Sequence, residues 1–171
     1  MALDPAPGPG HDSVVSPTTG ALLSRTWFAA DMPPAVSRRL AAIGAIADVE
    51  TGMPVVQEGT PCRSLGVVVS GRIALRLAVP GVGDRTILTI DEGDLFGWSA
   101  LLPGSLATST GIALVPTRVV LFERDRMLAA LASDDELAAA VYRRVLIAVV
   151  RRLHATRLQL LDVYRAGNEP W

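Results

Sequence analysis

Short runs of apolar and β-branched residues alternate with turn signals through the middle of the chain, from residue 48 to residue 123. Within residues 72–77 the large apolar side chains occupy every second position and both arginines fall on the other face, which is the period of a β-strand. Such spacing of runs and turns is typical of a small sandwich, barrel or jelly roll. We therefore expect about eight short strands, with β-rich runs at residues 55–56, 65–69, 73–77, 86–90, 108–113 and 117–122.

Helical spacing appears on the N-terminal side of this β region. Apolar residues from Trp27 to Ile46 fall near every third or fourth position, so residues 26–47 are interpreted as mainly helical. Pro33 and Pro34 fit a helix start, where a missing N–H has no consequence. We expect a short turn followed by a helix from about residue 34 to 44, with Trp27 and Phe28 as an anchor in the core.

On the C-terminal side, Met127, Leu128 and Leu131 predict a short helix. Ser133, followed three residues later by Glu136, is a helix-start signal with Ser133 as the N-cap. We expect a long helix from about residue 134 to 164, which at about 1.5 Å per residue is longer than one small domain can cover.

Apolar residues are spaced 3-4-3-4-3 along this long helix, which is the pattern of a coiled-coil seam. The pattern predicts a two-fold homodimer, and the alternative is that the seam packs only on its own β domain. The predicted seam contains Leu146, Val149, Leu153, Thr156, Leu160 and Val163.

Proline, glycine and serine dominate the first residues, so residues 1–24 are expected to form a flexible arm. A single domain is then predicted over residues 25–165. It has N-terminal helices at 25–47, a β-roll at 48–123 and C-terminal helices at 124–165, and residues 166–171 form a tail.

Composition narrows the classes of function. The formal net charge of −1 argues against a nucleic-acid surface, because neutralising phosphates requires a basic patch. No apolar run approaches the length of a membrane span, and no basic residue precedes Arg25, so we expect neither a membrane partner nor a secretory signal. The single Cys62 excludes an intrachain disulfide and fits a reducing compartment. Together these features predict a cytoplasmic protein.

Few residues of the sequence could act as catalytic groups or metal ligands. The only histidines are His11 in the arm and His154 on the long helix, so no metal site or Ser-His-Asp set can be proposed. Cys62 beside Arg63 is more simply an unreactive thiol than a nucleophile. We expect no enzyme activity and no metal.

The stretch from Asp91 to Gly104 has the residues of a ligand-binding turn. Glycine lets the backbone turn where a side chain would clash, and the amides of Trp98, Ser99 and Ala100 after Gly97 can open a short helical turn. Unpaired amides at such a turn form a nest for an anion. The simpler alternative is a glycine-bounded turn that binds nothing.

Four short motifs occur in a specific order: QEG at residues 57–59, VVVSG at 67–71, EGDLFG at 92–97 and RRLHAT at 151–156. In this arrangement residues 26–165 resemble the cyclic nucleotide-binding domain of the catabolite-activator (Crp/Fnr-like) family. The resemblance implies a mainly β fold with α-helices. This fold is a double-stranded β-helix, or jelly-roll β-roll, with an N-terminal helix and a long C-terminal dimerisation helix.

The resemblance also implies a site. Thr156 matches the position on the long helix that faces the base of a bound nucleotide, and Arg157 follows it. The family's phosphate-binding cassette corresponds here to Phe96, Gly97, Trp98, Ser99, Ala100, Ala107, Thr108 and Ser109.

Both charged positions of the cassette differ from the family. Trp98 stands where the family has the Glu that holds the ribose hydroxyl, and Ala107 stands where it has the Arg that pairs with the cyclic phosphate. A micromolar ligand binds with about −8 kcal/mol, and losing one member of a buried charge pair costs roughly 2–5 kcal/mol. We therefore expect weak or no cAMP binding, unless another arginine such as Arg76 or Arg85 reaches the phosphate.

Family transcription factors continue past the dimer helix into a helix-turn-helix, whereas this sequence ends at Trp171. We therefore expect a member of a stand-alone branch that does not read DNA in the family's manner.

Two functions remain open. The first is a dimeric regulatory sensor that binds a cyclic nucleotide or another small anionic ligand, with no other cofactor. The second is a ligand-free module that keeps only the fold and binds an unknown protein partner.

Overall fold

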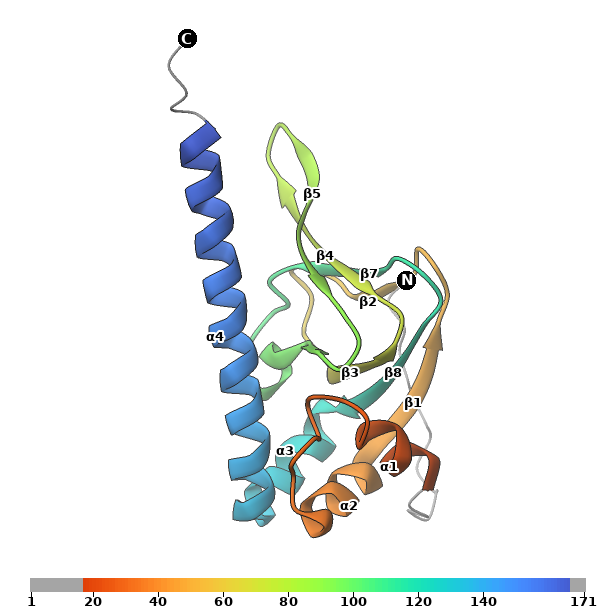
Figure 1. The fold of residues 1–171 in the computed structure, drawn as a ribbon. Helices are drawn as coiled ribbons and strands as arrows, with labels where there is room; N and C mark the ends of the chain where they lie inside the picture. The colour runs from red at the N-terminus through yellow and green to blue at the C-terminus, as the bar shows by residue number, and fades with distance from the viewer. Residues whose placement is uncertain (1–16, 167–171) are drawn as a thin grey trace.

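Two antiparallel four-stranded sheets form the centre of the molecule (Figure 1). This computed structural model describes residues 17–166. The strand order is β1-β8-β3-β6 in one sheet and β2-β7-β4-β5 in the other. The strands are β1 (Gly44–Val49), β2 (Pro54–Val56), β3 (Ser64–Ser70), β4 (Ile73–Val79), β5 (Gly83–Ile90), β6 (Leu95–Phe96), β7 (Thr110–Ala113) and β8 (Thr117–Glu123). The predicted β-roll fold class is confirmed.

Alternating side chains of the first sheet fill two separate cores. Along β8, Val120 and Phe122 pack toward the helices, whereas Val119 and Leu121 pack toward the second sheet. Successive side chains of a strand point to opposite faces, so a strand with both faces buried is apolar throughout. This explains the unbroken apolar sequence of β8 and of neighbouring β3.

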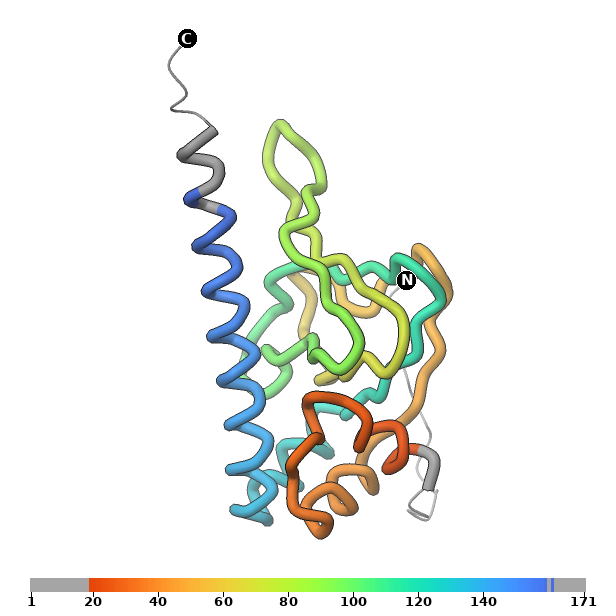
Figure 2. The backbone as a smooth tube through the Cα atoms, in the orientation of Figure 1, coloured from red at the N-terminus to blue at the C-terminus, as the bar shows by residue number. Residues whose placement is uncertain are grey.

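Four α-helices cover the outer face of this first sheet. They are α1 (Pro17–Leu23), α2 (Pro34–Ile43), α3 (Arg124–Ser133) and α4 (Asp135–Ala166). Phe28, Leu40, Met127 and Val141 are fully buried in the helical core. Figures 1 and 2 show α4 running along one side of the molecule, past both the helices and the sheets.

The N-terminal region differs from two expectations. Helix α1 occupies part of the predicted arm, and its Leu23 is buried in the core; residues 1–16 lie outside the described part. Residues 44–47 are strand, not helix, because α2 ends at Ile43 and β1, which begins at Gly44, pairs with β8. A Cβ at Gly44 would come within 2.8 Å of Val120 Cγ1, so glycine allows this close pairing.

The start of the long helix also differs in its capping residue. Ser133 is the last residue of α3, and its hydroxyl donates to the Ala130 carbonyl. Asp134 Oδ1 instead accepts from the Leu137 amide at 3.0 Å, which satisfies one of the open donors of the first turn of α4. The helix break between α3 and α4 therefore moves the cap by one residue.

Within residues 17–166, no helix combines the length and the apolar composition that a membrane span requires.

Candidate functional site

The turn after β6 has the left-handed geometry that its sequence predicts. Gly97 has φ = 67° and precedes a 3₁₀ helix, η1 (Trp98–Leu101). The buried thiol of Cys62 donates to the Gly97 carbonyl at 3.4 Å, and a Cβ on Gly97 would overlap the carbonyl oxygen of Ser64. Glycine is therefore required here both for the backbone angle and for the close approach of another strand.

The predicted nest of amides is smaller than expected. The Ala100 amide donates to the Gly97 carbonyl at 3.0 Å, because the turn is a 3₁₀ helix in which each amide reaches back three residues. Ala100 is fully buried against Cys62 and Ala107. Ala100 is thus part of the support of the turn and does not line the pocket described next.

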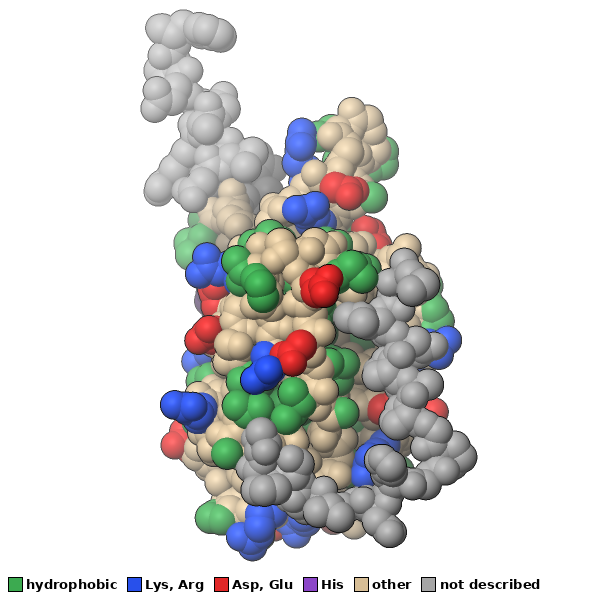
Figure 3. All heavy atoms as spheres, turned by 90° about the vertical axis from the view of Figure 1, so that its right-hand side faces the viewer, with side chains coloured by type: hydrophobic (Ala, Val, Ile, Leu, Met, Phe, Trp, Pro, Cys, Tyr) green, Lys and Arg blue, Asp and Glu red, His purple; other side chains and the backbone are tan. Residues whose placement is uncertain are grey.

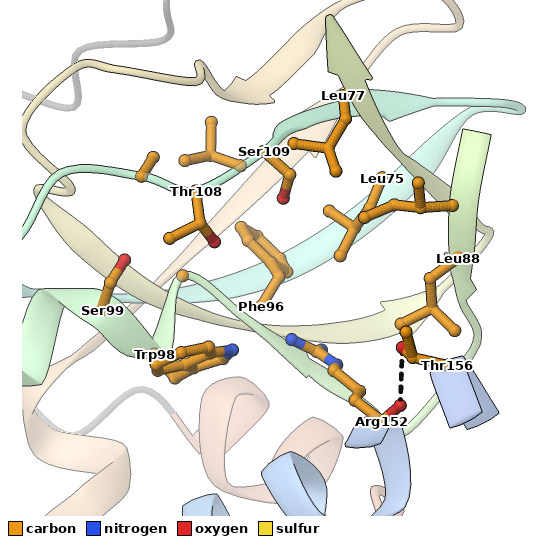
Figure 4. Close-up of a pocket in the computed structure, with 14 residues that line it drawn as sticks. Leu75, Leu77, Leu88, Phe96, Trp98, Ser99, Thr108, Ser109, Arg152 and Thr156 are labelled. Carbon is orange, nitrogen blue, oxygen red and sulfur yellow. Dashed lines mark hydrogen bonds between the residues drawn. The ribbon is translucent and has the colours of Figure 1, made fainter. Parts of the chain in front are cut away.

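A pocket of about 280 Å³ lies between this turn, the second sheet and α4 (Figure 4). Its volume is near the lower end of the range for small-molecule sites. The predicted residues that line it are Phe96, Gly97, Trp98, Ser99, Ala107, Thr108, Ser109 and Thr156, and their role in ligand binding stays a prediction. Sequence reasoning missed Val56, Leu75, Leu77, Ile87, Leu88 and Arg152.

Of the two residues predicted to face the base from the long helix, Thr156 lines the pocket and Arg157 does not. The Thr156 hydroxyl lines the pocket but donates to the Arg152 carbonyl at 2.9 Å, which is an intrahelical bond (Figure 4). Arg157 is exposed and does not line the pocket. The helix turns by about 100° per residue, so the neighbour of Thr156 points elsewhere.

Arg152 is the positively charged side chain among the described residues that line the pocket. It reaches from α4 toward Phe96 and Trp98 (Figure 4). Its guanidinium donates to the Leu95 carbonyl. Arg76 and Arg85, the candidates named from the sequence, do not line the pocket. A sequence signal existed, because Arg152 precedes Thr156 by four residues and therefore shares its helix face.

Burial and charge act on Arg152 and Asp94 together. Burial lowers the pKa of Arg152, and the nearby charge of Asp94 opposes that change. Burial likewise raises the pKa of Asp94, whereas Arg152 and then Arg151 oppose the rise. An arginine keeps its charge even after such a change, so the pocket holds a cation near neutral pH.

This raised pKa of Asp94 predicts a pH dependence of stability. A carboxyl group whose pKa is higher in the folded state contributes stability at low pH and loses it as pH rises through that folded-state pKa. The free energy of unfolding of the wild type, relative to Asp94→Asn, should therefore fall as pH rises from about the ordinary value of 3.8 toward neutrality. Urea unfolding of both proteins from pH 3 to 7 measures this difference, and a constant or rising difference would contradict it.

Helix α4 presents two different faces. Val141, Ala148, Arg152 and Ala155 lie toward the body, at spacings of seven, four and three residues. In contrast, 63% of Leu146 and 49% of Leu153 is exposed, while Val149 is half-buried. The alternative that the whole seam packs on its own β domain is therefore wrong at Leu146 and Leu153. The side chains of Leu160 and Val163 lie outside the described part.

Trp27 and Phe28 have separate roles. Phe28 is fully buried, as expected of a core anchor, and lies 6.3 Å from the Phe122 ring. Trp27 is half-buried, and its ring lies 5.3 Å from Arg144 Cζ and 4.3 Å from Arg151 Cζ. These cation–π contacts attach the segment before α2 to α4.

The described residues offer few other candidates for a nucleophile or a metal ligand. Cys62 is buried, and His154 is exposed on α4, whereas His11 lies outside the described part. No group of three histidine, cysteine, aspartate or glutamate side chains within residues 17–166 could hold a metal ion.

Comparison with known proteins identifies related sequences and folds. A family profile described as "Cyclic nucleotide-binding domain" matches residues 47–134. A curated relative from Mycobacterium tuberculosis, a CRP-like cAMP-activated global transcriptional regulator, is 24% identical over 116 residues. That alignment covers 68% of this chain and 50% of the relative, so the chain spans about half the length of the curated relatives it matches.

Solved structures share the fold at low sequence identity. A cyclic nucleotide-binding domain from Methylobacillus flagellatus aligns with a TM-score of 0.73 and 19% identity, covering 84% of this chain and 81% of that one. The catabolite activator protein of Thermus thermophilus aligns with a TM-score of 0.66 and 21% identity, covering 80% of this chain and 62% of that one. These likenesses show that the β-roll and its flanking helices have a common architecture.

Proposed function

Since the chain belongs to the cyclic nucleotide-binding domain family, we propose that it is a dimeric sensor of a small molecule and binds cAMP weakly or not at all. The observation that carries this proposal is the pocket at the family's cassette position, lined by Trp98 and Ala107. The resemblance assigns the family's ribose-binding Glu and phosphate-binding Arg to these two positions. Without either partner the pocket loses the two charge-assisted contacts of the family's cassette, and its remaining cation among the described residues, Arg152, lies on α4 and not at the cassette position.

Helix α4 supports a route from the pocket to the dimer. Arg152 and Thr156 line the pocket, while Leu146 and Leu153 on the same helix are exposed. An exposed apolar stripe on a long helix is typical of a helix that packs against a second helix of a partner chain. The face opposite α4 instead shows arginine, acidic and apolar side chains interspersed (Figure 3). Because the pocket residues and the exposed leucines are on one helix, a ligand that contacts Arg152 and Thr156 would act on the helix of the proposed dimer interface.

A thermal-shift screen tests whether the pocket binds any small molecule. Cyclic mononucleotides, cyclic dinucleotides and small organic anions should be screened against the full chain at fixed salt. A ligand at about 100 times its dissociation constant stabilises the folded state by about 2.7 kcal/mol. We expect a rise in Tm with at least one compound. No rise with any compound at millimolar concentration would contradict the sensor and favour the ligand-free interaction module.

Restoring the family's charged pair should restore cAMP binding. The double variant Ala107→Arg and Trp98→Glu should bind cAMP at least about tenfold more tightly than the wild type, because partnered charges return to the pocket. Each single variant should gain less, since it leaves one polar end of the ligand unpaired. Calorimetric titration of the four proteins measures these affinities, and an equal gain from one substitution alone would contradict the two-position explanation.

A further inference from the structure

We propose that Arg152 is the anion-binding residue of the pocket and that the ligand is a small organic monoanion with an apolar body. This inference rests on the proposed sensor function and names its ligand class. It places the ligand's anionic group at the guanidinium of an α4 residue and not at the cassette position of Ala107, where the resemblance puts the family's arginine (Figure 4). The argument depends on the placement of Arg152, on the remaining lining residues and on the size of the pocket.

Arg152 has the hydrogen-bonding capacity for an anion. Its guanidinium has five N–H donors, and the contact that the structure shows is with the Leu95 carbonyl. None of the ion pairs formed among the described residues includes Arg152. A half-buried cation without a bonded carboxylate is poorly compensated, so an incoming anion gains both charge pairing and a bidentate contact.

The position of Arg152 between two cavities allows it to serve the pocket. It lines the pocket of about 280 Å³ and also a smaller cavity of about 170 Å³, which Asp94 and Arg151 line as well. Burial lowers the pKa of Arg152 and Asp94 opposes that effect from this second side. Asp94 thus stabilises the charge, while the side of the guanidinium toward Phe96 and Trp98 faces the pocket (Figure 4).

The rest of the lining defines the body of the ligand. The described lining residues include no aspartate or glutamate, and Arg152 is their one cation, which matches one negative charge and no second charged group. Hydroxyl groups of Ser99, Thr108 and Ser109 lie on the wall across from Arg152 and can accept or donate single hydrogen bonds (Figure 4). The other walls are mainly apolar, formed by Val56, Leu75, Leu77, Ile87, Leu88 and Phe96.

Pocket size sets an upper bound on the ligand. A volume of about 280 Å³ suits a compact molecule better than a cyclic dinucleotide with two phosphates. The resemblance assigns the family's phosphate-binding cation to the position of Ala107, whereas here the cation comes from Arg152 on another element. The ligand would therefore bind with its charged end directed toward the helix.

A matched pair of probes separates charge from shape. We would titrate 4-phenylbutyrate and its neutral analogue 4-phenylbutyramide into the full chain by calorimetry at pH 7 and fixed salt. The wild type should bind the carboxylate at least about tenfold more tightly than the amide, because a charge-assisted contact replaces a neutral one. Arg152→Gln should abolish this preference, and Arg152→Lys should retain part of it because lysine keeps the charge without the planar fork.

The control is Arg143→Gln, which removes an exposed arginine of the same helix that does not line the pocket. This variant should keep the full preference for the carboxylate. Thermal unfolding of each variant checks folding, and Arg152→Lys keeps the test valid if Arg152→Gln is unfolded. An equal affinity of the wild type for both probes, or a preference that survives in Arg152→Gln, would overturn the inference.

The two proposals fail in different ways. If a cyclic nucleotide stabilises the wild type and Arg152→Gln equally, the sensor function stands and the role of Arg152 is wrong. If neither phenylbutyrate probe nor any compound of the thermal-shift screen binds the wild type, both are wrong.

Discussion

Replacing Leu153 by Asp should convert the proposed dimer into monomers. Leu153 lies in the predicted seam of α4, and 49% of it is exposed in the single chain. A second copy on this face would exclude water from Leu153, and an unpaired carboxylate buried there costs about 3–5 kcal/mol. The dissociation constant should therefore rise at least about 100-fold. Sedimentation at micromolar concentration measures the change in mass.

Leu158 provides a matched control. It is on the same helix and 64% of it is exposed, but it lies outside the 3-4 spacing of the seam. Leu158→Asp should therefore leave the mass of the dimer unchanged. A wild type that sediments as a monomer at micromolar concentration, or a Leu153→Asp variant that stays dimeric, would contradict the predicted interface.

Gly97→Ala should strongly destabilise the fold. The left-handed angle of Gly97, φ = 67°, disfavours alanine by about 1–2 kcal/mol. The added methyl group would also overlap the Ser64 carbonyl oxygen, which belongs to the backbone of β3 and cannot rotate away. Forcing atoms into a packed region costs a further 1–3 kcal/mol or so. We expect a total loss of about 2–5 kcal/mol, measured by urea unfolding.

Gly104→Ala isolates the backbone angle from the overlap. Gly104 has almost the same angle, φ = 65°, but a Cβ there would meet no atom within 4 Å. This variant should lose only the cost of the left-handed angle, about 1–2 kcal/mol. Equal losses in the two variants would show that the overlap with the Ser64 carbonyl oxygen adds no cost. That result would contradict the prediction for Gly97→Ala.

A strand could be predicted from the sequence where the apolar residues fit the period of a strand and not that of a helix. In residues 72–77 the alternation of apolar residues and arginines fits only a strand, and β4 forms there. Ile46 fits both a helical spacing and a strand, so the sequence could not decide between them. The decision depends on Gly44, where the close approach of Val120 is a tertiary contact.

The candidate site was predictable on the cassette side and not on the helix side. Phe96, Gly97 and Ser109 were assigned to the site through the resemblance of their segments to the family's cassette, and all three line the pocket. Helix α4 instead carries two series of residues at 3-4 spacing, one that includes Ala148 and Arg152 and one that includes Leu146 and Leu153. Periodicity gives the angle between the two faces but not which of them packs on the body. The one sequence signal for Arg152 was its spacing of four residues from Thr156, and only the folded chain shows that this face packs on the body.

Calorimetric titration of cAMP into the wild-type chain, at fixed salt and pH 7, tests the central claim most directly. The pocket has Ala107 and Trp98 at the two positions where the family has its charged partners. We predict a near-millimolar dissociation constant or no measurable heat, since each lost charge contact removes roughly 2–5 kcal/mol from a site of about −8 kcal/mol. Submicromolar binding of cAMP by the wild type would contradict the account.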